Sequence, residues 1–481
     1  MPPGTDLHGP AFANDASEIV ASDPSDTERP VPVPERHCPT KRQMLRQGRS
    51  AILSSEEKQA QHDARMPFVQ PRGQLATVLN LSTVTFLVML GLSMVAPILP
   101  GYAADFGVSY ALVGFVISSF AIARMLLDMP AGFLSRRYNK KIIMISGLML
   151  IVVSSIMAGS APNYVALVIA RMIEGAGSAL YVTTATVFLA QIAGTEKRGQ
   201  LMSVYSGTLL LGSVFGPTFG GFIAAVYDIH APFYAYAIVA GLGVVPTLAL
   251  PNLASSENVA SLKRRLSRIH DVWVVLSHPS FLLGTMATFT LFFIRTGVKN
   301  TLVPLYAQNN LGLDSTAIGL ILTFAGLATA VTMVPVGSLS DRIGRRNPIM
   351  LCLLLSAVAT LFIPLSVNMV QLSICVVAYG AAVGLSGPIA AYVTDVSPED
   401  KLEVSMGLFR TISDVGFFAG PLLLGYLSDI SATPPSGDGS MPAQIGMLPF
   451  LVASVILIVA GLVFAKADDP ARTRSKQHPV I

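Results

Sequence analysis

Long apolar runs alternate with short polar connectors along most of the chain. Twelve runs can be separated, each of about 20 residues or more, which is enough to cross the ~30 Å hydrocarbon core of a bilayer as a helix. Inside a bilayer the backbone has to satisfy its own hydrogen bonds, and a helix does so within one segment. The pattern therefore predicts an all-α integral membrane protein with twelve transmembrane helices. The expected spans are 77–100, 111–134, 141–160, 163–191, 200–226, 232–250, 280–306, 313–337, 348–366, 369–394, 403–428 and 443–465.

The composition excludes a soluble protein. Hydrophobic residues make up 52% of the 481 residues and charged residues 12%, whereas a soluble domain carries about 25% charged residues. Most of the charges lie in the first 75 residues, in the connectors and at the C-terminal end. So few charges cannot cover a water-facing surface. The formal net charge of +4 is explained by membrane topology and does not indicate nucleic-acid binding.

Lys and Arg are divided unevenly between two alternating sets of connectors. Every connector of one set contains Lys or Arg, as in SRRYNKK, GTEKRG, SLKRRLSR and SDRIGRR, and no connector of the other set does, as in GYAADFGVS and AQNNLGLDS. Loops rich in Lys and Arg remain in the cytoplasm. We therefore expect both termini to be cytoplasmic in a multi-pass protein of the plasma membrane, with the vacuolar or another internal membrane as the alternative.

The chain is expected to have five parts. Residues 1–75 are polar, lack the apolar core of a signal peptide and are expected to form a disordered cytoplasmic tail. Two bundles of six helices, at 76–250 and 280–466, follow. A cytoplasmic linker at 251–279 joins them, and residues 467–481 form a C-terminal tail. The linker is expected to form an amphipathic surface helix because of its basic residues, which are Lys263, Arg264, Arg265 and Arg268.

A basic ten-residue phrase occurs twice, each time after a long apolar run. GFLSRRYNKK begins at Gly132 and GSLSDRIGRR at Gly337, which is 205 residues later. The Gly216–Pro217 pair recurs as Gly420–Pro421 after a similar distance, 204 residues. The repeated loop phrase and the repeated Gly–Pro pair lie at equivalent helices, which indicates that the chain consists of two six-helix halves. Parallel repeats of this kind, related by an axis along the membrane normal, build one large class of transporters.

Three motifs together resemble the major facilitator superfamily. GSLSDRIGRR resembles the loop motif G-x-L-(a)-D-R-x-G-R-R of that family, RMIEGAGSALY from Arg171 resembles its fourth-helix motif, and GSVFGPTFGG from Gly212 resembles the fifth-helix motif of its drug:proton antiporters. The resemblance covers about residues 77–466. It implies the major facilitator fold and secondary active transport by alternating access.

The resemblance also implies a conformational latch in the second-half loop. In the family, the loop Asp caps or pairs with the start of a neighbouring helix and holds the cytoplasmic side shut, and Asp341 occupies that position. The first copy departs from the pattern, since Arg136 replaces the Asp, and we expect Asp128 to take over part of its role. The alternative is that both basic loops serve only as topology determinants. The other residues expected to belong to the latch are Gly337, Arg342 and Arg345.

Charged residues inside the spans are expensive, at about 2.5–3.5 kcal/mol or more near the bilayer centre, so each needs an explanation. Three pairs have i,i+3 or i,i+4 spacing and share a helix face: Arg124 with Asp128, Arg171 with Glu174, and Arg410 with Asp414. They either hold the bundle together as neutral pairs or form the substrate and proton-coupling site. An acid that gains and loses an Arg partner changes its proton affinity. Glu174 and Asp414 are therefore the expected coupling residues.

One cation in the membrane is left over. The three acids of the pairs face four arginines, and the unmatched one is Arg295, at midplane depth in the seventh span. An anionic group of the substrate or a carboxylate on another helix, Glu174 or Asp414, has to compensate it. The sequence leaves both choices open. Lys299, farther along the same helix, is expected to snorkel to the interface.

The fifth span carries a stripe of small residues. Gly212, Gly216 and Gly220 recur every four residues and permit close approach of another helix, while Pro217 permits a bend. The second half lacks the complete stripe, because Leu424 stands at the third position. The asymmetry favours an exporter, although the motif could be a packing kink without bearing on the direction of transport.

The sequence thus predicts a proton-coupled exporter of small organic molecules, of the kind responsible for drug or metabolite efflux. Two alternatives remain: an importer or uniporter of a small organic anion, and a membrane receptor or scaffold without transport. No nucleotide loop, metal-spaced cluster or nucleophile constellation is found, so an enzyme, a cofactor or a metal site is not expected. The expected partners are the substrate, protons and lipid, with no nucleic acid, and the protein is expected to be a monomer.

Overall fold

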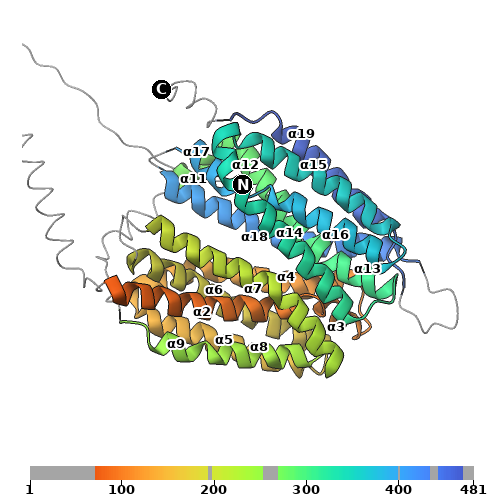
Figure 1. The fold of residues 1–481 in the computed structure, drawn as a ribbon, viewed down its shortest axis with the longest axis horizontal. Coiled ribbons are helices and arrows are strands. Elements are labelled where there is room, and N and C mark those ends of the chain that lie inside the picture. Colours follow the sequence, from red (N-terminus) through yellow and green to blue (C-terminus); the bar gives the residue numbers. More distant parts are fainter. Residues whose placement is uncertain (1–70, 193–197, 253–268, 399–400, 434–442, 470–481) are drawn as a thin grey trace, which may run out of the picture. The chain divides into compact units, whose positions relative to one another are not determined.

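The computed structural model describes residues 71–192, 198–252, 269–398, 401–433 and 443–469. Nearly all of them lie in helices, and one isolated bridge joins Thr433 to Gln444. Figure 1 shows two sets of long helices side by side, one from each half of the sequence. Lys263, Arg264, Arg265 and Arg268 of the expected linker helix lie outside the described residues, which resume with the short helix α11 (Ile269–Leu276).

The first half consists of six spans. The α2 helix ends at Val95, short of the expected end of the first run, because Pro97 follows and the residue before a proline disfavours helical backbone. A short helix, α3, then continues the chain. The helices of this half are α2 (Pro71–Val95), α3 (Leu99–Ala104), α4 (Tyr110–Arg137), α5 (Lys140–Gly159), α6 (Tyr164–Ile192), α7 (Arg198–Val226), α8 (Ala231–Leu242) and α9 (Val244–Leu248).

The second half repeats this plan with more interruptions. Its first span changes from α-helix to π-helix and back, and its fourth is broken between Gly384 and Ile389, where Pro388 precedes the second segment. The helices are α12 (Pro279–Ile294), η1 (Arg295–Leu302), α13 (Val303–Asn309), α14 (Ser315–Ile343), α15 (Arg346–Phe362), η2 (Ile363–Leu365), α16 (Met369–Gly384), α17 (Ile389–Val396), α18 (Leu402–Ser431) and α19 (Leu448–Phe464).

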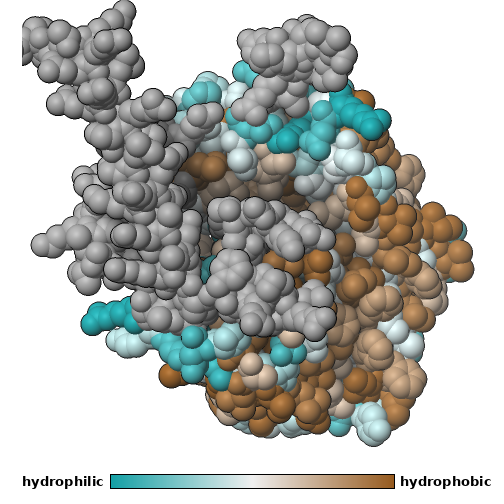
Figure 2. Space-filling view, turned by 60° about the vertical axis from the view of Figure 1, so that its left-hand side comes forward, coloured by the Kyte–Doolittle hydropathy of each residue, from teal (hydrophilic) through white to brown (hydrophobic). Residues whose placement is uncertain are grey.

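The prediction of twelve transmembrane helices is confirmed. In the described part of the chain, 11 helical stretches are long and apolar enough to cross a membrane, and the shorter apolar α19 completes the set. Large hydrophobic side chains stay exposed on the outer faces of these helices, including Leu126, Val334 and Ile374. Hydrophobic side chains cover much of the coloured surface in Figure 2. Such a surface suits lipid and not water.

Two seams join the halves: α4 packs against α18, and α7 packs against α14. Both seams are close where α4 and α14 begin, which we call the non-basic end because its connectors contain no Lys or Arg. The Ser118 hydroxyl donates to the Phe418 carbonyl at 2.6 Å across the first seam. A Cβ on Gly114 would overlap the carbonyl of Pro421, and one on Gly319 would overlap that of Pro217. Backbones therefore touch along both seams.

The halves are apart at the opposite end, where α4 and α14 finish, which we call the basic end. In the described part of the chain, Gly207, Gly337 and Gly407 have no atom within 4 Å of the position that a Cβ would take. These glycines lie on α7, α14 and α18, the helices that form the seams. The halves therefore touch at the non-basic end, whereas these three positions toward the basic end have no close neighbour among the described residues, as in a structure that is open on that side.

Candidate substrate and coupling site

The Arg171–Glu174 pair lies inside the first half. The two side chains form an ion pair on α6, and both residues are buried. The Arg171 guanidinium lies over the Phe120 ring, 4.9 Å from its centroid. The Oε1 atom of Glu174 and the hydroxyl of Tyr236 are buried without a hydrogen-bond partner among the described residues. The i,i+3 pairing inferred from the sequence is present, and it leaves one carboxylate oxygen available.

Asp414 forms its ion pair across the seam. Its Oδ1 atom lies 3.1 Å from Nη2 of Arg124, which belongs to the other half. The Nε atom of the same guanidinium lies 3.7 Å from Oδ2 of Asp128, and the Thr183 hydroxyl donates to the other oxygen of Asp128 at 2.8 Å. One arginine thus serves two carboxylates, one from each half.

The expected pairing of Asp414 with Arg410 is wrong. Arg410 is exposed and makes no ion pair with a described residue, although it acts on Asp414 through space. The i,i+4 spacing puts the two residues on one face, but the facing helix supplies a cation at the same depth. Arg124 lies 14 residues after Tyr110, about 21 Å along α4, and Asp414 lies 12 residues after Leu402, about 18 Å along α18. Both positions are near the middle of their helices.

Arg295 opens the π-helix η1 in the middle of the seventh span. The Thr301 hydroxyl donates to the Thr296 carbonyl five residues back at 2.9 Å, and the Thr296 hydroxyl donates across to the Phe417 carbonyl at 3.1 Å. These bonds hold the widened turn against α18. A π-helix is rare and occurs frequently at functional sites. The residue pattern of the seventh run contains no signal that would have predicted it.

The Arg295 side chain is exposed, and in the described part of the chain it has no carboxylate within ion-pair distance. It interacts electrostatically with Tyr379 on α16 and with Arg124 on α4. The structure thus brings Arg124, Asp414 and Arg295 to one level of the seam. Tyr379, Phe120 and Phe417 surround that level and were not found from the sequence, because aromatic residues in apolar spans are too common to be distinctive.

The loop residues of the second half interact with one another. Arg345 lies 2.6 Å from Asp395 and 3.3 Å from Asp341, and the Asp341 side chain remains 66% exposed. Gly344 ends α14 with a φ of 95°, a conformation that glycine adopts without strain. Arg342 is exposed beside it. Among the described residues Asp341 therefore pairs with Arg345 of its own loop and makes no ion pair with the first half, while the side chain of Arg136 lies outside the described residues.

The glycine stripe of α7 faces α2. A Cβ on Gly212, Gly216 or Gly220 would lie too close to backbone or Cβ atoms of α2. Pro217 lies within α7, and its carbonyl faces Gly319 on α14. The stripe therefore supports packing within the first half, whereas the Pro217 carbonyl faces α14 of the second half.

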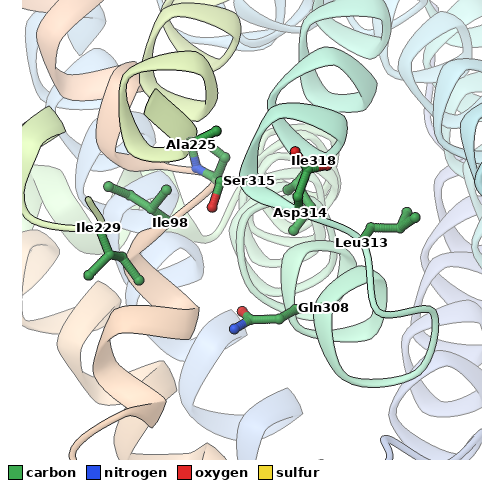
Figure 3. A pocket seen from close by; sticks show the side chains of 9 residues that line it. Ile98, Ala225, Ile229, Gln308, Leu313, Asp314, Ser315 and Ile318 are labelled. Carbon is green, nitrogen blue, oxygen red and sulfur yellow. The ribbon is translucent and has the colours of Figure 1, made fainter. Parts of the chain in front are cut away.

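A pocket of about 340 Å³ lies at the non-basic end and is distinct from the charged level. Figure 3 shows Gln308 reaching from α13 toward Ile98 and Ile229 of the first half. The one carboxylate of its lining, Asp314, caps α14 by accepting from the Ala317 N–H at 3.2 Å. The charged residues that the sequence predicts as the site line the middle of the seam and not this pocket. No group of three or more His, Cys, Asp or Glu residues suited to a metal occurs among the described residues.

Two bundles of apolar helices with charges at mid-depth in their seam define a membrane transporter of the two-bundle class. The chain belongs to the Major Facilitator Superfamily, whose sequence pattern matches residues 81–309 and 287–480. It resembles the drug:proton antiporter branch, as the sequence motifs indicate.

The relatives agree with this placement. The chain is 22% identical to multidrug resistance protein 2 of Bacillus subtilis over 78% of this chain and 90% of that protein. It is 25% identical to the quinolone resistance protein NorA of Staphylococcus aureus over 73% and 89% of the two chains. Among solved structures, a bacterial homologue of the human lysosomal transporter Spinster superposes with a TM-score of 0.67 at 15% identity, over 85% of this chain and 99% of that one. This last similarity supports the fold alone.

Proposed function

We propose that this transporter exports small organic molecules in exchange for protons that move inward, by alternating access. The observation that carries the proposal is the Arg124–Asp414 ion pair, which crosses the seam between the two halves at 3.1 Å. A pair within one half would stay intact when the halves rock. A pair across the seam is a contact that rocking can break and remake.

The orientation follows from the loops. Connectors rich in Lys and Arg are cytoplasmic, so the basic end faces the cytoplasm, as do both termini. The described conformation is then the one open to the cytoplasm. Labelling of cysteines placed at Arg265 and Gly437 tests this topology, because the two positions should lie in different compartments. Labelling of both from one side would contradict it.

Proton coupling follows from the free-energy cost of an unpaired charge inside the membrane. Opening the non-basic end separates α4 from α18, so that Asp414 loses Arg124 and takes up a proton from outside, because an uncompensated carboxylate is costly there. Closure brings Arg124 back, and the proton leaves toward the open cytoplasmic side. Glu174 already has Arg171 on its own helix, and it serves as a second proton acceptor through its unpartnered oxygen.

Export, and not import, is supported by two observations. The glycine stripe on α7 packs tightly on α2, as the motif of the exporters leads one to expect, and the relatives carry the names of multidrug and quinolone resistance proteins. The alternative is import or facilitated diffusion of an organic anion by the same two bundles.

Proteoliposome flux under an imposed pH gradient tests the proposal with ethidium, norfloxacin and benzoate as probes. The wild-type protein should accumulate at least one probe against its gradient. Asp414→Asn should abolish this accumulation and retain exchange of the same probe at equal pH, because the titrating group is lost and the shape is kept. Glu174→Gln should reduce it. Undiminished pH-driven accumulation in both variants would reject coupling through these acids.

A further inference from the structure

The charges at the level of Arg124 and Asp414 do not balance. Arg171 and Glu174 neutralise each other inside the first half. The remaining acids, Asp128 and Asp414, share the single guanidinium of Arg124. Three other cations lie nearby: Arg295, Lys299 and Arg410. Arg295 interacts electrostatically with Tyr379 and Arg124, and Lys299 interacts with Arg295. Arg410 acts on Asp414, which Arg124 already pairs.

Arg295 lies between the two halves, and we call the space beside it toward the basic end the recess. It is 16 residues after Pro279 in a span that ends at Asn309, hence near the bilayer centre. The η1 segment contacts α18 and α4, and the guanidinium has neighbours on α16 and α4, which belong to different halves. A side chain that is exposed yet placed among these helices faces the space that opens toward the basic end.

Lys299 strengthens the same feature. It follows Arg295 by four residues on η1, is half-buried, and has Arg295 as its electrostatic neighbour. The Tyr379 hydroxyl beside Arg295 is buried and has no hydrogen-bond partner among the described residues. Arg295 and Lys299 repel each other, and the Tyr379 hydroxyl is unused. An anion bound beside them would compensate the charge and pair the hydroxyl, because unpaired charges and donors are costly inside a membrane.

We infer that Arg295, Lys299 and Tyr379 form the binding site for the carboxylate of an anionic organic substrate. The planar guanidinium matches a carboxylate through two parallel hydrogen bonds, and the ammonium adds charge without directional demand. A lipophilic cation would be repelled at this site. The inference rests on the proposed function in that it assigns the substrate class for the same central site. It also decides the choice that the sequence left open, because Glu174 and Asp414 pair with other arginines.

The test measures binding to the purified full-length protein in nanodiscs at one pH, which needs no proton gradient. The probes are benzoate with benzamide, octanoate with octanamide, and tetraphenylphosphonium. We expect at least one carboxylate to bind the wild type more tightly than its amide. Arg295→Gln should weaken that carboxylate at least about 10-fold, the loss typical of a charge-assisted hydrogen bond, and leave the amide unchanged. Lys466→Gln, which removes an exposed positive charge at the basic end, should bind as the wild type does.

Arg295→Lys is the control for folding, because it keeps the positive charge and loses the two parallel hydrogen bonds of the guanidinium. Its affinity for the carboxylate should lie between those of the wild type and Arg295→Gln. Three results would overturn the inference: tetraphenylphosphonium binds and neither carboxylate does; Arg295→Gln binds the carboxylates as tightly as the wild type; or Arg295→Gln is unstable and a second change, Asp414→Asn, restores stability. The last result would make Asp414 the true partner. Carboxylate binding without pH-driven flux would instead reject the proton coupling and leave this inference intact.

Discussion

The carboxylate of Asp429, near the end of α18, accepts hydrogen bonds from the backbone N–H groups of Tyr110 and Ala111 at the start of α4, at 2.7 and 2.9 Å. A side chain of one half thus caps a helix of the other half. A carboxylate at a helix N-terminus satisfies otherwise unpaired N–H groups and complements the helix dipole. These two hydrogen bonds join the halves at the non-basic end and would have to break for that end to open.

Asp429→Asn should shift the protein toward the conformation open at the non-basic end. Asn still accepts the hydrogen bond, so loss of the charge next to the helix N-terminus is expected to cost the closed form about 0.3–1 kcal/mol. Accessibility of a cysteine at Ser109 to a membrane-impermeant reagent should rise. The matched control is Asp228→Asn, since Asp228 caps α8 within the first half by accepting from the N–H groups of His230 and Ala231, both at 2.8 Å. Equal accessibility in both variants would show that Asp429 does not act as a gate.

Gly114→Ala should prevent closure of the same end. Its Cβ would overlap the Pro421 carbonyl across the seam, and a backbone atom cannot move aside as a flexible side chain can. The conformation closed at the non-basic end should be lost and transport should fall by an order of magnitude or more, measured as substrate flux in proteoliposomes. Gly407→Ala is the control, because nothing lies within 4 Å of its added Cβ among the described residues. Normal flux in Gly114→Ala would mean that the seam is looser than the structure indicates.

Asp341→Asn tests the latch. Asp341 is exposed, and its one ion pair with a described residue is to Arg345 at 3.3 Å. The free energy of unfolding should therefore change by no more than about 0.5 kcal/mol. If Asp341 holds the cytoplasmic side shut in the other conformation, transport should fall and cysteines in the recess should become more accessible from the cytoplasm. Unchanged transport together with unchanged accessibility would leave the basic loops as topology determinants only.

The connector at the non-basic end should show a pH dependence. Desolvation raises the pKa of Asp105, and His230 partly opposes this shift. A carboxyl whose pKa is raised on folding binds more protons when folded, so it lowers stability as the pH rises from the unfolded pKa through the folded one. In the wild type the melting temperature should therefore fall as the pH rises from the unfolded pKa of Asp105 to its folded pKa. In Asp105→Asn this fall should be smaller, and the protein should be slightly more stable than the wild type at pH 7. The side chain is exposed, so the effect is small, and Asp341→Asn at the basic end is the comparison. A steeper fall in Asp105→Asn would contradict this account.

The sequence by itself determined the helical architecture and the membrane class. An apolar run of about 20 residues has one stable form in hydrocarbon, so the spans follow from local composition alone. The i,i+3 pair of Arg171 and Glu174 followed for the same reason, because both residues lie on one helix and their distance depends on helix geometry. The spacing of Gly212, Gly216 and Gly220 likewise marked a face for close packing, although it did not name α2 as the neighbour.

Only the tertiary structure decided which charges meet. The partner of Asp414 is Arg124 and not Arg410, because the depth and rotation of α4 against α18 place a cation from the other half beside it. Among the described residues Arg295 has no carboxylate partner, because Asp414 and Glu174 pair with other arginines. Contacts between residues nearly 300 positions apart depend on how the two bundles pack together. Helical periodicity describes one helix at a time and does not predict that packing. The proposed substrate site therefore depends on how the two halves pack against each other.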